Sequence, residues 1–131
     1  MNVLILVVDD EPDVTDLFRQ QFRRELRAGR FAMVFAHSAV EALEHVAAAD
    51  GASLILVFSD INMPGMTGLE LLPLVRAARP DVPVIMITAY GDAETRERVL
   101  AGGAAGLLTK PIDFGVLRAE IDARLAAVAT R

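Results

Sequence analysis

The sequence predicts an α/β fold of five βα units, with a doubly wound sheet of five parallel strands in the order 2-1-3-4-5. Two fully apolar, β-branched runs, at 3–8 and 54–58, are typical of central parallel strands that helices cover on both faces. Segments with apolar side chains at spacings of three and four alternate with such runs. Because crossovers between parallel strands are right-handed, helices on both faces require a doubly wound sheet.

Each element has its own local signal. A long first helix is predicted from Pro12, a residue suited to a first helical turn, and from the apolar stripe Val14, Leu17, Phe18, Phe22 and Leu26. Ser38-x-x-Glu41 and Thr67-x-x-Glu70 are interpreted as capping boxes at helix starts. The expected strands are 2–8, 31–36, 54–59, 83–87 and 105–109, and the expected helices are 12–27, 39–49, 68–78, 92–101 and 114–128.

Composition limits the class of protein. A chain of 131 residues suits one domain over 1–131, and 53% hydrophobic against 24% charged residues excludes disorder. Without cysteine, disulfides and thiolate metal sites are excluded. The apolar runs are far shorter than the roughly 20 residues of a membrane helix, and no basic segment precedes the first of them. We therefore expect a cytoplasmic domain without a membrane partner.

The charged residues give little sign of nucleic-acid binding. The formal net charge is -5, whereas a surface that binds a duplex normally has a basic balance over a whole face. One basic cluster stands out, which we interpret as a solvated helix face: Arg19, Arg23, Arg24, Arg27 and Arg30. Direct nucleic-acid binding by this domain is not expected.

Acidic and basic side chains follow the predicted strands where a ligand would bind. In doubly wound sheets, ligands lie beyond the carboxyl ends of the strands at the point where strand order reverses. Asp9, Asp10 and Glu11 follow the first strand, Asp60 the third. A lone aspartate is more often a helix cap, but three converging carboxylates need relief by a cation or a raised pKa, and Mg²⁺ is the simplest such cation.

Two further residues complete the set. Thr88 follows the fourth strand and Lys110 the fifth, so a hydroxyl and a cation join the carboxylates. These groups are the ones needed to hold the oxygens of a transferring phosphoryl group. Asp60 is then the expected nucleophile, since carboxylates can form aspartyl-phosphate intermediates.

Four motifs connect these residues to a known family. They are LVVDDEPD at 6–13, SDINMPGMTGLELL at 59–72, PVIMITAY at 83–90 and GLLTKPID at 106–113. Over nearly its whole length the chain resembles the CheY-like receiver domains of response regulators. The resemblance implies a phosphoacceptor of a two-component system, a signalling switch that catalyses only its own phosphorylation and dephosphorylation.

The resemblance also implies a role for each residue. Asp60 would be the phosphoacceptor, Asp10 a direct Mg²⁺ ligand, Asp9 a ligand through water, and Asn62 a ligand through its backbone carbonyl. Thr88 would bind the phosphoryl group and move on activation, Lys110 would pair with that group, and the Lys110–Pro111 bond would be cis.

The chain departs from the family at its expected switch. Leu107 stands where most members carry an aromatic residue, whose rotation reports the movement of Thr88. Tyr90, two residues after Thr88, occupies a position that tunes dephosphorylation and is large enough to shield the site from water. We therefore expect signalling through the loop after Thr88 and the following helix.

The expected partners are a sensor histidine kinase or phosphotransfer protein, and an output domain or protein on the face formed by 92–101, 105–109 and 114–128. A homodimer is compatible with this interpretation.

Two other functions fit the sequence less well. A flavodoxin-like flavin site would need glycines and hydroxyls at 9–11, and a haloacid-dehalogenase phosphatase would need the pattern D-x-D after the first strand, where this chain has D-D-E. A receiver that takes no phosphate and serves as a protein-binding scaffold stays open as an alternative.

Overall fold

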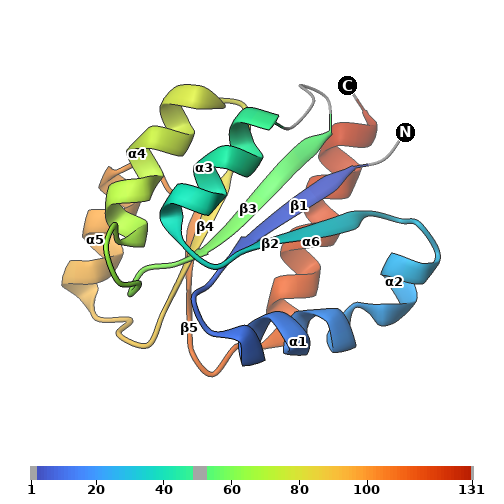
Figure 1. Ribbon diagram of the computed structural model, residues 1–131, viewed down its shortest axis with the longest axis horizontal. Coiled ribbons are helices and arrows are strands. Elements are labelled where there is room, and N and C mark those ends of the chain that lie inside the picture. Colours follow the sequence, from blue (N-terminus) through green and yellow to red (C-terminus); the bar gives the residue numbers. More distant parts are fainter. Residues whose placement is uncertain (1–2, 49–52, 131) are drawn as a thin grey trace.

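Five parallel strands form the central sheet of the computed structural model, which describes residues 3–48 and 53–130 (Figure 1). Their order is β2-β1-β3-β4-β5, and every neighbouring pair is parallel. The predicted fold class and strand order are therefore confirmed. The strands are β1 Leu4–Val8, β2 Ala32–Ala36, β3 Leu54–Asp60, β4 Val84–Thr88 and β5 Gly106–Thr109.

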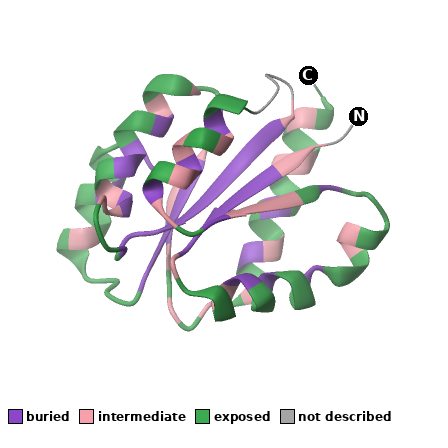
Figure 2. Cartoon of the chain, viewed as in Figure 1, coloured by how far each residue is buried: buried purple, intermediate pink, exposed green. Residues whose placement is uncertain are grey.

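Helices cover both faces of this sheet, which separates two apolar cores. One core takes side chains from α3, α4 and α5, and the other takes side chains from α1 and α6. Figure 2 shows that the buried residues concentrate in the central strands and on the inner sides of the helices. The helices are α1 Pro12–Gln21, α2 Arg23–Arg27, α3 Ala39–Ala48, α4 Gly68–Ala78, α5 Ala93–Ala101 and α6 Phe114–Ala129.

The burial of β3 accounts for the continuously apolar run at 54–58. All seven of its residues are buried, because helices lie above and below it. Successive side chains point to opposite faces, so Val57 belongs to the core under α3 and α4, while Phe58 belongs to the core under α1 and α6. The last residue of this strand is Asp60, whose position is thus fixed by a fully buried element.

The prediction of one continuous helix over 12–27 is wrong, because the structure has two helices there, α1 and α2, which are interrupted at Phe22. There the backbone takes φ -109° and ψ 17°, although the Phe22 amide still donates to Phe18 at 3.1 Å. The Phe22 ring is fully buried, with its centroid 5.9 Å from that of Phe31 and 6.1 Å from that of Phe114. Spacings of three and four continue through the break, so the pattern could not show it. Leu17, expected on the inner face, is 40% exposed.

Other boundaries differ by a residue or so. Asp60 and Thr88, expected just after their strands, are the last residues of β3 and β4, because they pair with Ile87 and Thr109. Positions 2 and 49, at the ends of the expected elements 2–8 and 39–49, lie outside the described residues. Within the described part of the chain, no helix is long and apolar enough to cross a membrane.

The two predicted capping boxes have different outcomes. At Thr67 the box is complete, since its hydroxyl accepts from the Glu70 amide and the Glu70 carboxylate accepts from the Thr67 amide. At the start of α3 the Glu41 amide donates to the Ser38 hydroxyl at 3.1 Å, but the Glu41 carboxylate accepts from the backbone amide of His37 and not from that of Ser38.

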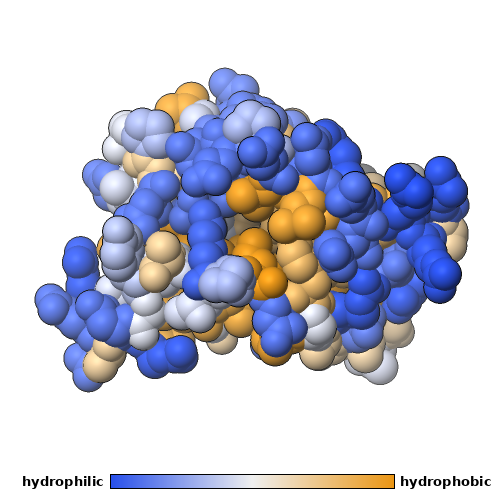
Figure 3. Space-filling view, turned by 90° about the horizontal axis from the view of Figure 1, so that it is seen from below, coloured by the Kyte–Doolittle hydropathy of each residue, from blue (hydrophilic) through white to orange (hydrophobic). Residues whose placement is uncertain are grey.

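The surface seen from below is mainly hydrophilic, with a small apolar area near its middle (Figure 3).

Candidate functional site

The three predicted carboxylates meet at the carboxyl ends of β1 and β3. β1 and β3 are neighbours in register, with Val8 opposite Ser59, so the residues that come next in each strand lie side by side. Each of Asp9, Asp10 and Asp60 offers a carboxylate oxygen, and these three oxygens all lie within 4.8 Å of one another. The predicted convergence is therefore present at the point where the strand order reverses.

One lysine faces this acidic group. The Nζ atom of Lys110 lies 3.2 Å from Asp60 Oδ2 and 3.5 Å from Asp9 Oδ2. Both carboxylates belong to residues that are only 3% exposed, while Asp10 is half-buried. Lys110 is the only lysine in the chain. Within the described residues, one cation thus pairs with two carboxylates of a group of three, and both of these have lost most of their water.

Burial and the neighbouring charges shift the pKa values of Asp60 and Lys110. Burial raises the pKa of Asp60 above its usual value, and the charge of Asp9 raises it further. Lys110 and the Asn62 amide act in the opposite direction and compensate only in part. Burial alone would lower the pKa of Lys110, but the charges of Asp9 and Asp60 outweigh it and raise that pKa. The site therefore has an excess of desolvated negative charge, which a hard divalent cation would relieve.

Backbone amides hold the carboxylates in place. Asp9 Oδ1 accepts from the Glu11 amide at 2.9 Å, and Asp60 Oδ1 accepts from the Asn62 amide at 3.2 Å. The Asp9 amide in turn donates to the Ala36 carbonyl at 3.0 Å, which ties it to the end of β2. The acidic group is therefore preorganised by the ends of three neighbouring strands.

The predicted switch residues belong to β4, to the loop after it and to β5. Thr88 is buried, and its Oγ1 accepts from the Tyr90 amide at 3.1 Å. The Lys110 amide donates to the Thr88 carbonyl at 2.8 Å, so the hydroxyl and the ammonium group start from adjacent strand ends. The Tyr90 side chain is 69% exposed, whereas Leu107 is 6% exposed within the core under α4 and α5.

Comparison with known proteins identifies the family. A family model described as the response regulator receiver domain matches residues 5–122. The chain belongs to this family. The peptide bond between Lys110 and Pro111 is cis, as the family resemblance implied.

Curated relatives of this receiver domain are longer response regulators. The chain is 37% identical over 115 residues to the response regulator protein PilR of Pseudomonas aeruginosa, covering 86% of the chain and 24% of PilR. It is 36% identical over 125 residues to the response regulator MprA of Mycobacterium ulcerans, covering 95% of the chain and 51% of MprA. The chain thus spans about a quarter to half of these relatives.

Solved structures agree with the fold. A CheY-like receiver domain protein from Methanospirillum hungatei has a TM-score of 0.85 and 28% identity, covering 99% of this chain and 98% of that one. The chemotaxis protein CheY4 of Vibrio cholerae has a TM-score of 0.80 and 27% identity, covering 95% and 99%.

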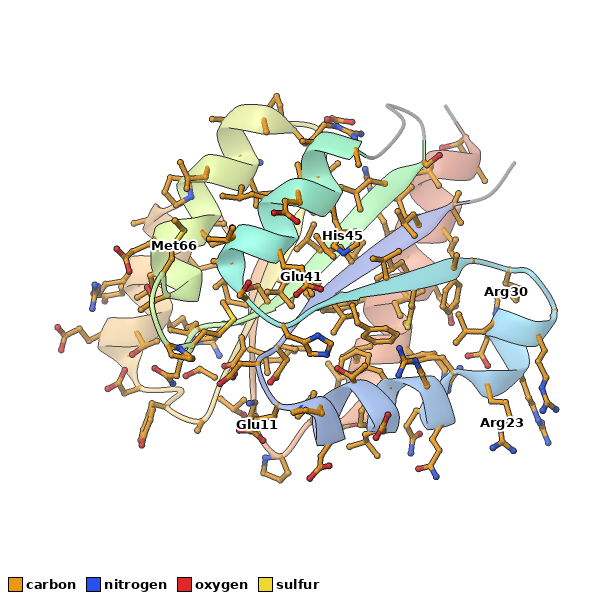
Figure 4. The ribbon with its side chains drawn as sticks, viewed as in Figure 1. Glu11, Arg23, Arg30, Glu41, His45 and Met66 are labelled. Carbon is orange, nitrogen blue, oxygen red and sulfur yellow. The ribbon has the colours of Figure 1, made fainter. Side chains whose placement is uncertain are left out.

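Two candidate groups outside the site remain surface features. Glu41 and His45 lie next to each other on α3, and His37 and His45 each come within 4.0 Å of Glu41 Oε1, longer than a hydrogen bond (Figure 4). These three side chains are half exposed. Arg23 extends away from the sheet, whereas Arg30 pairs with Asp122 of α6 at 3.4 Å (Figure 4).

One residue that shapes the site is missed by sequence reasoning. A Cβ atom on Gly68 would stand 2.2 Å from the Asp60 carbonyl oxygen and 2.8 Å from Ile61 Cα. The start of α4 therefore packs directly on the backbone that carries Asp60. Gly68 lies inside the SDINMPGMTGLELL motif, and that motif was the only available signal.

Proposed function

We propose that this receiver domain accepts a phosphoryl group on Asp60 in a Mg²⁺-dependent reaction and changes conformation as a result. The observation that carries the proposal is the meeting of three carboxylates with a single lysine at the carboxyl ends of β1, β3 and β5. Asp9, Asp10, Asp60 and the backbone carbonyl of Asn62 are the proposed Mg²⁺ ligands. The excess negative charge of the group supports this assignment, because a divalent cation balances it.

In the proposed phosphoryl transfer, Asp60 is the nucleophile, and Mg²⁺, Lys110 and Thr88 stabilise the phosphoryl oxygens. A carboxylate oxygen of Asp60 forms a bond to phosphorus while the bond from phosphorus to the donor, such as a histidine nitrogen, breaks and its electron pair leaves with the donor. Bound Mg²⁺ supplies charge neutralisation for the carboxylates and the phosphoryl oxygens. Lys110 balances further charge on those oxygens, and the Thr88 hydroxyl donates a hydrogen bond to one of them.

The same contacts suggest how the switch operates. Thr88 Oγ1 accepts from the Tyr90 amide in this structure. If Thr88 turns toward a phosphoryl group, that hydrogen bond lengthens and the loop over 89–92 has to rearrange. Leu107 is buried and offers no aromatic ring to report the movement, so the loop and α5 are the proposed route.

The partners follow from the family. We propose a sensor histidine kinase or phosphotransfer protein as donor, and an output domain or protein that reads the face of α5, β5 and α6, in the cytoplasm. A homodimer is also compatible with the proposal. The domain acts as a switch and catalyses only its own phosphorylation and dephosphorylation. A single domain over 1–131 stays a prediction.

Intact-mass analysis tests the proposal. With Mg²⁺ and acetyl phosphate, the wild-type chain should gain one phosphoryl group, and Asp60→Asn should gain none. Chelation of Mg²⁺ should prevent the gain. A wild-type chain that stays unmodified under these conditions would favour the alternative, a scaffold that binds partners without phosphate.

A further inference from the structure

The loop over 89–92 lies against the end of β5. A Cβ atom added to Gly91 would stand 2.1 Å from Thr109 Cγ2 and 3.5 Å from Thr109 Cβ. Non-bonded carbon atoms are at their optimal separation at about 3.5–4.0 Å. No side chain at position 91 therefore fits while the loop and Thr109 keep their present positions.

Space, rather than backbone conformation, is what excludes a side chain at Gly91. Among the described residues, the glycines with positive φ are Gly29, Gly65 and Gly103. Gly91 is not one of them, so an alanine could adopt its backbone angles. The contact with Thr109 is the obstacle that remains.

Thr109 is directly connected to the switch. It is the partner of Thr88 in the ladder between β4 and β5, and the next residue, Lys110, donates its amide to the Thr88 carbonyl at 2.8 Å. Thr88 Oγ1 accepts from the Tyr90 amide at 3.1 Å, and Tyr90 precedes Gly91. Contacts therefore form a closed ring that joins the Thr88 hydroxyl to the loop and the loop to β5.

The loop over 89–92 is short, so a displacement of Gly91 also displaces its neighbours. After Thr88 ends β4, Asp92 already caps α5, and its Oδ1 accepts from the Thr95 amide at 2.8 Å. The residues in between are therefore held at both ends. A shift at Gly91 has to reach either the Tyr90 amide or the first turn of α5.

We propose that Gly91 is a positioning residue for the switch. Its close approach to Thr109 stabilises the resting loop, in which the Tyr90 amide occupies the Thr88 hydroxyl. A side chain at 91 would destabilise this resting position and favour the arrangement in which Thr88 is free to turn toward Asp60. The inference rests on the proposed function, because that second arrangement is the phosphoryl-bound one. A ligand that prefers it should bind more tightly when the resting state is weakened.

A short series of variants tests the contact. Gly91→Ala should bind beryllofluoride, measured by fluorine NMR with Mg²⁺ present, about two- to tenfold more tightly, the range set by forcing one exposed side chain off its rotamer. The gain should vanish in Gly91→Ala/Thr109→Ala and be largest in Gly91→Ala/Thr109→Val, which has a methyl at both branch positions. Thr109→Ala and Thr109→Val alone are the matched controls. Unchanged or weaker binding in Gly91→Ala, or a gain that persists with Thr109→Ala, would overturn the inference.

A second readout separates this inference from the proposed function. Without metal or beryllofluoride, the Tyr90 amide proton should move upfield in Gly91→Ala, as its hydrogen bond to Thr88 weakens, and return in the double variant with Thr109→Ala. If the wild type binds the mimic and this proton does not move, only the inference about Gly91 is wrong. If the wild type fails to bind the mimic, the proposed function is contradicted and the inference falls with it.

Discussion

Among the residues that the structure describes, Lys110 is the only cation paired with the acidic group, and replacing it by methionine removes that charge. The Lys110 ammonium lies 3.2 Å and 3.5 Å from oxygens of Asp60 and Asp9. Removing one partner of a fully buried pair typically costs about 3–5 kcal/mol. The Lys110 side chain keeps 23% of its exposure, and Asp60 can take up a proton, so the cost is reduced. We expect the free energy of unfolding to fall by about 1–3 kcal/mol at neutral pH without Mg²⁺.

The loss of stability in Lys110→Met should depend on pH. The folded pKa of Asp60 is raised, so the stability that Asp60 contributes is present at low pH and is lost as pH rises through that pKa. Without Lys110 the pKa of Asp60 rises further, and the loss extends to higher pH. The pKa of Lys110 is raised as well, so its own contribution is present below its usual pKa and is lost only in alkali. The difference between variant and wild type should therefore grow from acid to neutral pH.

Urea unfolding followed by circular dichroism measures this difference. Transitions are compared at several pH values, with and without Mg²⁺, and the slope with urea should stay unchanged. Lys110→Arg keeps the charge and should lose less, while Arg98→Met removes an exposed cation of α5 and should change little. A cost that is equal at all pH values, or no cost at neutral pH, would refute the reasoning about charge.

Three further predictions concern the same site. Asp10→Asn should weaken Mg²⁺ binding by at least about tenfold in calorimetric titration, because a direct ligand should contribute at least as much as an outer-shell partner; unchanged affinity would contradict the metal assignment. Asp60→Asn should raise the free energy of unfolding at neutral pH without metal, by on the order of 1 kcal/mol, because it removes a desolvated charge; the gain should shrink as pH falls, and an equal gain in acid would count against it. Beryllofluoride should change the emission of Tyr90, the only tyrosine in the chain, beyond the effect of Mg²⁺ alone, and should not do so in Asp60→Asn; an unmoved spectrum in protein shown to bind the mimic would exclude the loop as the route.

The fold was predictable because its signals are local and repeated. Continuous apolar runs mark strands buried on both faces, and the handedness of crossovers then leaves few arrangements. The interruption at Phe22 was not predictable, since an apolar residue at that spacing fits a continuous helix equally well. At this interruption the Phe22 ring packs against Phe31, on the segment that leads into β2, and against Phe114 of α6, contacts that helical spacing does not reveal.

The site was predictable to the extent that it depends on strand ends. Asp9, Asp60 and Lys110 meet because parallel strands place their carboxyl ends at one edge of the sheet. The contact of Gly91 with Thr109 could not be predicted, because it depends on how a short loop folds over a neighbouring strand. Gly68 lies within a motif, but only the structure shows that it packs on the Asp60 backbone.

Locating the phosphoryl group on the chain tests the central claim most directly. After reaction with acetyl phosphate and Mg²⁺, borohydride reduces an aspartyl phosphate to homoserine, and tandem mass spectrometry of the digest then identifies the modified position. We expect homoserine at position 60, none without phosphodonor, and none in Asp60→Asn. Homoserine at position 9 or 10, or no homoserine in a chain that has gained the mass of a phosphoryl group, would contradict it.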